Sequence, residues 1–82
     1  MDHNEIIKKL NGIFIDVLDN PDIALKNETS ASDIEEWDSL NHIQLVVAIE
    51  KSFGIKFTAK EIQSWKNIEE MSNSIAGKLN SK

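Results

Sequence analysis

The chain has 82 residues, carries fourteen Asp and Glu against nine Lys and Arg, and contains no cysteine. This length supports one domain, residues 1–82, with a modest core and little room for a deep substrate cleft. The acidic balance disfavours nucleic-acid binding, and the missing cysteine excludes disulfides, zinc–thiolate sites and cysteine nucleophiles; we expect no metal site.

The first predicted element is a helix over residues 3–18. Its apolar residues recur at three- and four-residue steps and form one stripe, Ile6, Leu10, Ile13, Phe14, Val17 and Leu18. Asp2 and Glu5 have the spacing of a capping box, and Asn20-Pro21 marks the end of the helix. The N-terminal residues lack the apolar run of a signal peptide and no stretch could span a bilayer, so we expect a cytoplasmic chain without membrane contact.

Residues 22–37 show no sustained period and predict a long ordered loop. Isolated apolar residues would pin this loop to the core: Ile23, Leu25, Ile34 and Trp37. From Asn27 to Glu50 there are six carboxylates and no Lys. A negative segment of this kind attracts partners with basic surfaces. A long loop in so small a domain is often functional.

The second predicted helix covers residues 39–53, with Asp38 as its N-cap and Gly54 as its C-terminal stop. At about 100° per residue, one side carries a core face of Leu45, Val46, Ile49 and Phe53. The opposite side carries Leu40, Gln44, Val47 and Lys51. Leu40 and Val47 are either ordinary exposed apolar residues or a stripe on which partner proteins dock.

The remaining residues predict a short helix after Thr58 and a last helix over residues 68–79. Asn67 and Glu70 have the spacing of a capping box before the last helix, whose apolar face is Ile68, Met71, Ile75 and Leu79. No strand pattern or repeat is present. The fold class is therefore all-α: a four-helix bundle of three longer helices and a short third helix, with a long loop between helices 1 and 2.

Ser39, at the start of the most apolar helix, has three interpretations. It could contribute only to capping. It could be a nucleophile served by His42, although no orienting partner or glycine-framed turn surrounds that pair. It could also receive a group that another enzyme attaches, because a phosphate ester is stabilised at a helix N-terminus. The last interpretation is favoured, and we expect that the chain is not an enzyme.

"DSL" at residues 38–40, followed by "IQLVVAIEKSFGIKF" at residues 43–57, resembles the acyl carrier proteins. The resemblance covers essentially the whole chain. It implies that Ser39 receives covalent 4′-phosphopantetheine from coenzyme A, whose arm would supply the thiol that the chain lacks. The partners it implies are a phosphopantetheinyl transferase, for which Asp38 matches the recognised acidic residue, and enzymes that load and transfer acyl or aminoacyl groups.

The resemblance also implies two sets of residues on the second helix. The partner-binding set is Asp38, Leu40, Asn41, Gln44, Val47 and Lys51. The set that lines the core, part of which could admit an acyl chain, is Ile43, Leu45, Val46, Ile49 and Phe53. We expect the carrier to be a monomer.

Several residues depart from the fatty-acid type of carrier. That type tends to be acidic at the positions of Asn41, Gln44 and Lys51, and has a small residue in place of Trp37. The departures favour a stand-alone carrier of a dedicated pathway over general fatty acid synthesis. The alternative from another class is an unmodified helical interaction module that keeps the carrier fold and docks through the Leu40 stripe.

Overall fold

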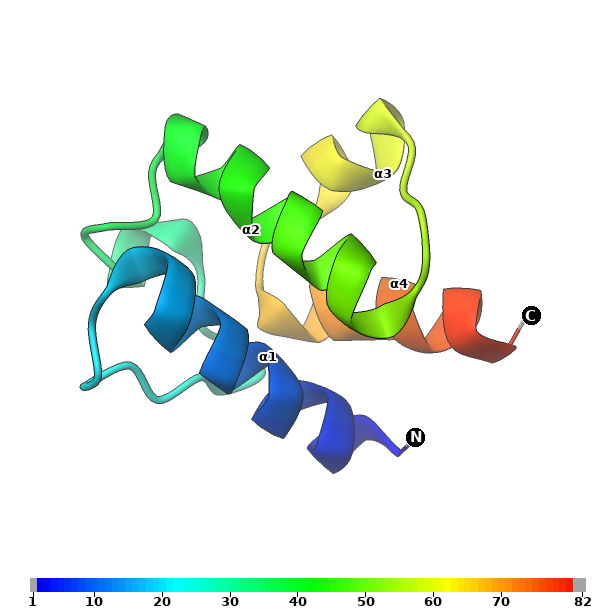
Figure 1. The fold of residues 1–82 in the computed structure, drawn as a ribbon, viewed down its shortest axis with the longest axis horizontal. Coiled ribbons are helices and arrows are strands. Elements are labelled where there is room, and N and C mark those ends of the chain that lie inside the picture. The colour runs from blue at the N-terminus through cyan, green and yellow to red at the C-terminus, as the bar shows by residue number, and fades with distance from the viewer. Residues whose placement is uncertain (1, 81–82) are drawn as a thin grey trace.

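The computed structural model describes residues 2–80, and this part of the chain is all-helical (Figure 1). Four α-helices follow one another with a short 3-10 helix, η1, in the long loop: α1 His3–Leu18, η1 Ala31–Asp33, α2 Ser39–Phe53, α3 Ala59–Ser64 and α4 Ile68–Asn80. The predicted fold class is confirmed. The predicted domain, residues 1–82, also includes Met1, Ser81 and Lys82, which lie outside the described residues.

Helix α1 begins and ends where its flanking side chains predict. The Glu5 backbone N–H donates to Asp2 Oδ1 at 2.9 Å, which satisfies one of the free amides of the first turn. After Leu18 the chain reverses through Asp19, which has a left-handed backbone (φ 53°) that Asp tolerates better than most residues. The helix therefore stops one residue before Asn20-Pro21.

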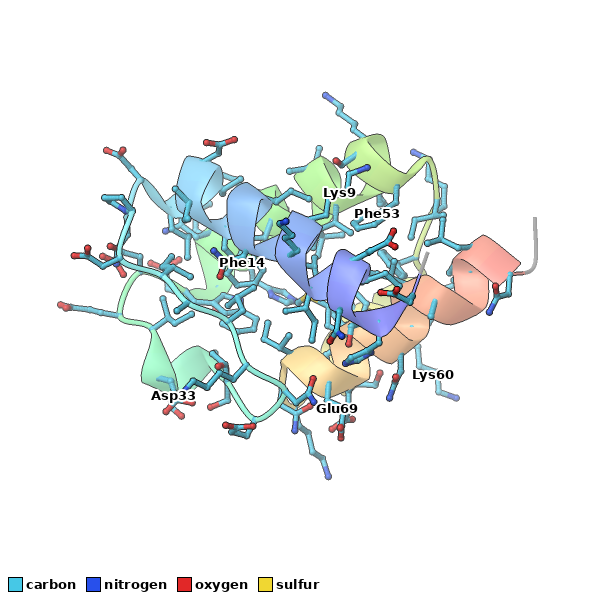
Figure 2. The ribbon with its side chains drawn as sticks, turned by 90° about the horizontal axis from the view of Figure 1, so that it is seen from below. Lys9, Phe14, Asp33, Phe53, Lys60 and Glu69 are labelled. Carbon is cyan, nitrogen blue, oxygen red and sulfur yellow. The ribbon has the colours of Figure 1, made fainter. Side chains whose placement is uncertain are left out.

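The core forms where α1 packs against α2 and α4. Fully buried side chains from the three helices meet there: Ile6, Leu10, Phe14, Leu45, Ile49, Ile68, Met71 and Ile75. At the open edge of the α1–α2 contact, the Lys9 ammonium lies over the Phe53 ring, 4.8 Å from its centroid (Figure 2). Burial of these apolar faces is the main source of stability in such a bundle.

The long loop between α1 and α2 is ordered by contacts at both ends. Asn11 on α1 holds its first part: the Leu25 N–H donates to Asn11 Oδ1 at 2.7 Å, and Ile23 and Leu25 are buried. Further on, the carbonyls of Asn27 and Thr29 accept hydrogen bonds from the first amides of α4, at 2.9 and 2.8 Å. The loop thus caps α4, and its ordered backbone leads into the start of α2.

Helix α3 has only six residues and is stabilised by polar side chains at its start. Thr58 and Glu61 form a reciprocal capping box, with the Thr58 N–H donating to Glu61 Oε1 at 2.9 Å. The same carboxylate accepts an ion-pair contact from Lys78 on α4 at 2.9 Å. Helix α3 is therefore tied to α4 and lies beside the N-terminal half of α2 across a cavity described below (Figure 1).

Candidate functional site

Ser39 is the first residue of α2, and its side chain is exposed. The preceding residue, Asp38, is extended and its Oδ1 accepts a hydrogen bond from the Asn41 N–H at 2.8 Å. The predicted N-cap is thus confirmed. Because the cap fixes the first turn, the backbone that carries the exposed Ser39 hydroxyl has a defined position at the positive end of the helix dipole.

The backbone on the N-terminal side of Ser39 is anchored by Trp37. This indole is 8% exposed, packs edge-on against Phe14 with ring centroids 5.0 Å apart, and donates its Nε1–H to His42 Nδ1 at 2.9 Å. The Asn41 side-chain amide also donates to the Glu36 carbonyl at 2.7 Å. These contacts hold the turn before Ser39 to both α1 and α2.

His42 flanks the core, and it is not paired with Ser39 by any hydrogen bond seen among residues 2–80. Its ring stacks on Trp37, at 6.0 Å and 23° between planes, and meets Trp65 edge-on at 6.1 Å. Because Nδ1 already accepts the Trp37 N–H, this nitrogen is not free to act as a base toward Ser39. The geometry does not support Ser39 as a self-activated nucleophile.

A cavity of about 680 Å³ opens directly beside Ser39, between α2, α3 and the turn before α2. Its walls are mostly aromatic and aliphatic: Trp37, His42, Ile43, Ile62 and Trp65. Lys66 brings a cation to the same cavity, and Asp38 brings a carboxylate. A flexible arm attached to Ser39 would start at its edge, so the residues present fit a covalent phosphopantetheine.

The exposed side of α2 carries the predicted docking residues. Leu40 is 67% exposed and Val47 is 44% exposed, and Gln44 and Lys51 are exposed beside them. Asn41 is half-buried, and its amide is engaged with the Glu36 carbonyl, so it also supports the loop. That these residues bind partners stays a prediction.

The prediction that Ile43 belongs to the core is wrong. Ile43 is 62% exposed, whereas Leu45, Val46, Ile49 and Phe53 are buried as predicted. Three residues after Leu40, Ile43 lies about 300° round the helix, which is about 60° from Leu40. It therefore extends the exposed apolar stripe; we call Leu40, Ile43 and Val47 the α2 stripe.

Helix α3, which contributes Ile62 and Gln63 to the cavity wall, carries a perturbed carboxyl, Glu61, in its first turn. The hydrogen bond from the Thr58 backbone, helped by the Lys78 ammonium, lowers the pKa of the Glu61 carboxyl below its usual range. The ionised carboxylate thus favours the conformation in which α3 is capped and joined to α4.

Ile62, Trp65 and Lys66 were not named as site residues from the sequence. They lie in or just after the predicted short helix, and residues twenty or more positions away from Ser39 give no local signal of their proximity to it. A wall assembled from separate segments becomes visible only once α3 is placed against α2. Within residues 2–80, none of the helices is long and apolar enough to cross a membrane.

Comparison with known proteins points to one family. The sequence model of the family described as "Phosphopantetheine attachment site" matches residues 8–75. Acyl carrier proteins from Petrotoga mobilis and Thermosynechococcus vestitus are 29% and 28% identical over 80 residues, covering 98% and 96% of this chain and 94% and 98% of their own.

A solved structure agrees in both sequence and fold. The solution NMR structure of a holo acyl carrier protein from Geobacter metallireducens is 39% identical to this chain and superposes with a TM-score of 0.88. The match covers 93% of this chain and 87% of that one.

Proposed function

The chain belongs to the acyl carrier protein family, whose members are carriers with covalent 4′-phosphopantetheine and not enzymes, and from this premise we propose that Ser39 is the attachment site. The exposed serine at the capped start of α2 carries the proposal, because its hydroxyl is accessible while the backbone around it is fixed. Attachment joins the serine oxygen to the phosphate of the arm as a phosphodiester.

The arm then carries acyl or aminoacyl groups as thioesters between enzymes that share no active site. The single 82-residue domain needs no cysteine of its own for this role, because the thiol belongs to the arm. Phosphopantetheinyl transferase and the loading enzymes would dock on the α2 stripe and the carboxylates near it. Such encounters are typically small and electrostatically assisted.

The docking face favours enzymes of a dedicated pathway over those of general fatty acid synthesis. Lys51 is exposed and Gln44 is neutral on the side of α2 that a partner would meet. A partner built for a uniformly acidic helix would place a basic side chain against Lys51, and that like-charge contact is unfavourable.

Intact mass tests the proposal after incubation with coenzyme A, magnesium and a broad-specificity phosphopantetheinyl transferase. The expected result is a gain of one phosphopantetheine by the wild type and none by Ser39→Ala, with both variants equally helical by circular dichroism. An equal gain of mass by both proteins would show that phosphopantetheine is attached to a residue other than Ser39. No gain by folded, unmodified wild type with several transferases would favour the unmodified interaction module.

A further inference from the structure

The sign of the charge reverses along the chain at the end of α2. Residues 27–50 carry six carboxylates and no Lys, whereas residues 51–60 carry three Lys and no Asp or Glu. Two of these lysines, Lys51 and Lys56, are exposed, and neither side chain forms an ion pair or a hydrogen bond within residues 2–80. This end of α2 therefore carries two ammonium groups that are not paired with any carboxylate in the described part of the chain.

The turn after α2 brings these two lysines to the same place. Gly54 has a left-handed backbone (φ 68°) that reverses the chain, and the N–H groups of Gly54 and Ile55 both donate to the Glu50 carbonyl, at 2.8 and 3.1 Å. Beyond the turn, the Phe57 N–H donates to Glu50 Oε2 at 2.8 Å. The connection from α2 to α3 (Figure 1) is thus fixed next to the last turn of α2.

A groove of about 280 Å³ lies between the end of α2 and this connection. Val47 and Ile55 provide its apolar walls, and Lys51 and Lys56 provide two cations. The only carboxylate among the residues that line it is that of Glu50, whose Oε2 already accepts a backbone N–H. The charged side chains of the groove therefore sum to one positive charge, next to apolar surface.

The dipole of α2 opposes an anion at this end of the helix, and Lys9 on α1 reduces that opposition. The Lys9 ammonium donates to the Ser52 carbonyl at 3.0 Å, which satisfies one of the free carbonyls of the last turn. Lys51 and Lys56 then remain available to a ligand. A carboxylate between them would meet two cations beside apolar walls, where solvent and salt screen the interaction less than on an open surface.

We infer that this groove binds an acidic side chain, together with a neighbouring apolar one, from an enzyme that docks on the carrier. The two ammoniums select the carboxylate by opposite charge, and Val47 and Ile55 provide the surface for its apolar neighbour. Val47 also belongs to the α2 stripe, so the groove continues the surface on which we propose that partners dock. The inference rests on the proposed function and adds the chemistry of the partner.

The groove is remote from the proposed attachment site. Lys51 follows Ser39 by twelve residues on α2, which corresponds to about 18 Å along the helix axis. An enzyme anchored at the groove leaves Ser39 uncovered, so the arm can move while the carrier stays docked. The groove therefore contributes to the choice and orientation of the partner and takes no part in the chemistry.

An NMR titration of the full-length protein with a synthetic peptide tests the inference. The probe is acetyl-Ser-Glu-Leu-Glu-Ser-amide, and its matched control has Gln in place of both Glu. The acidic peptide should shift the amide resonances of the groove in a saturable way: Val47, Lys51, Ile55 and Lys56. A Kd of about 1 mM is expected for so few contacts. The control peptide should bind about fivefold more weakly, the loss expected for exposed ion pairs, and added NaCl should weaken the acidic peptide.

Three variants assign the binding to the two lysines. Lys51→Gln and Lys56→Gln keep a long side chain but each removes one charge, so each should weaken the acidic peptide about twofold to fivefold. The variant with both changes should bind the acidic and the control peptide equally. Lys8→Gln removes the same charge from the exposed side of α1 and should leave the Kd unchanged. Thermal unfolding checks that each variant folds.

Several outcomes would overturn the inference. Equal binding of the two peptides by the wild type, shifts centred outside the groove, or no saturable shift well above the expected Kd would each do so. Groove resonances that depend on protein concentration without peptide would make a second copy of the chain the occupant, which also overturns it.

The titration does not require modification of Ser39, so it can fail independently of the proposed function. Loading of the wild type with phosphopantetheine but no binding of the acidic peptide at the groove would overturn this inference alone. A folded wild type that no transferase modifies would overturn the proposed function and, with it, the role of the groove in docking enzymes.

Discussion

Asp38 stabilises the first turn of α2 in addition to standing beside Ser39, the proposed attachment site. Its carboxylate accepts the Asn41 N–H at 2.8 Å. Removing an N-cap of this kind typically costs about 1 kcal/mol of stability. We expect Asp38→Ala to lower the free energy of unfolding in urea by about that amount.

The matched control is Asp16→Ala, which removes an exposed carboxylate from α1. Its effect should stay within about 0.5 kcal/mol, as for ordinary surface positions. Equal stability of the Asp38 and Asp16 variants would show that the cap is energetically unimportant. Because Asp38→Ala is less stable, its transferase rate should be divided by the fraction of the protein that is folded before it is compared with the wild-type rate.

At the scale of elements, α2 has one face buried in the core and one exposed face, on which we propose that partners dock. Val47 lies in the middle of the α2 stripe and is 44% exposed. Val47→Glu should leave helicity intact and reduce kcat/KM of the transferase at least about fivefold, the loss that separates contributing from neutral interface residues. Asn73→Glu adds the same charge on the exposed side of α4 and should react normally. Unchanged kinetics in Val47→Glu would remove Val47 from the interface.

Helix α3 should respond to acid through Glu61. Because the pKa of Glu61 is lowered in the folded protein, its contribution is complete above the ordinary Glu value of about 4.3 and is lost as the pH falls through the lowered value. Amide exchange in α3, followed by NMR, should therefore accelerate in acid. In Glu61→Gln, the α3 amides should exchange faster than in the wild type at neutral pH. Their exchange rate should also change less as the pH falls. Identical profiles for both proteins would contradict the Glu61–Lys78 tie.

The helices could be predicted because each has its own local signals. The bounds of α1 and α2 follow from Asp2, Asp38 and Gly54, which sit where the capping rules require, and from the three- and four-residue spacing of their buried faces. Ile43 was misplaced because it was assigned by resemblance, whereas its angle on the helix places it near Leu40. The cavity could not be predicted, because its walls come from separate segments that meet only when α3 is packed beside α2.

At the scale of the whole molecule, the net charge of −5 opposes compaction. The exposed carboxylates of the loop, among them Glu28, Asp33 and Glu35, lie close together in sequence and have no Lys between them. Raising NaCl from about 10 mM to about 300 mM shortens the screening length several-fold, so the melting temperature should rise. Glu35→Gln should reduce that rise. A melting temperature independent of salt would contradict the repulsion argument.

The same charge distribution makes the two ends of the proposed docking face on α2 different in charge. Carboxylates flank Ser39, whereas Lys51 is exposed at the far end of α2. A partner complementary to both ends would present basic side chains to the carboxylates near Ser39 and an acidic side chain to Lys51. This pattern, together with Lys51 itself, is the basis of the proposal that the chain serves enzymes of a dedicated pathway.

Attachment of phosphopantetheine to Ser39 is tested most directly by peptide fragmentation of the protein purified from its own cells. We expect the phosphopantetheine mass, and the ions released from it, to map to Ser39 and to no other serine. The same modification on another residue, or fully unmodified protein from cells whose other carriers are loaded, would contradict it.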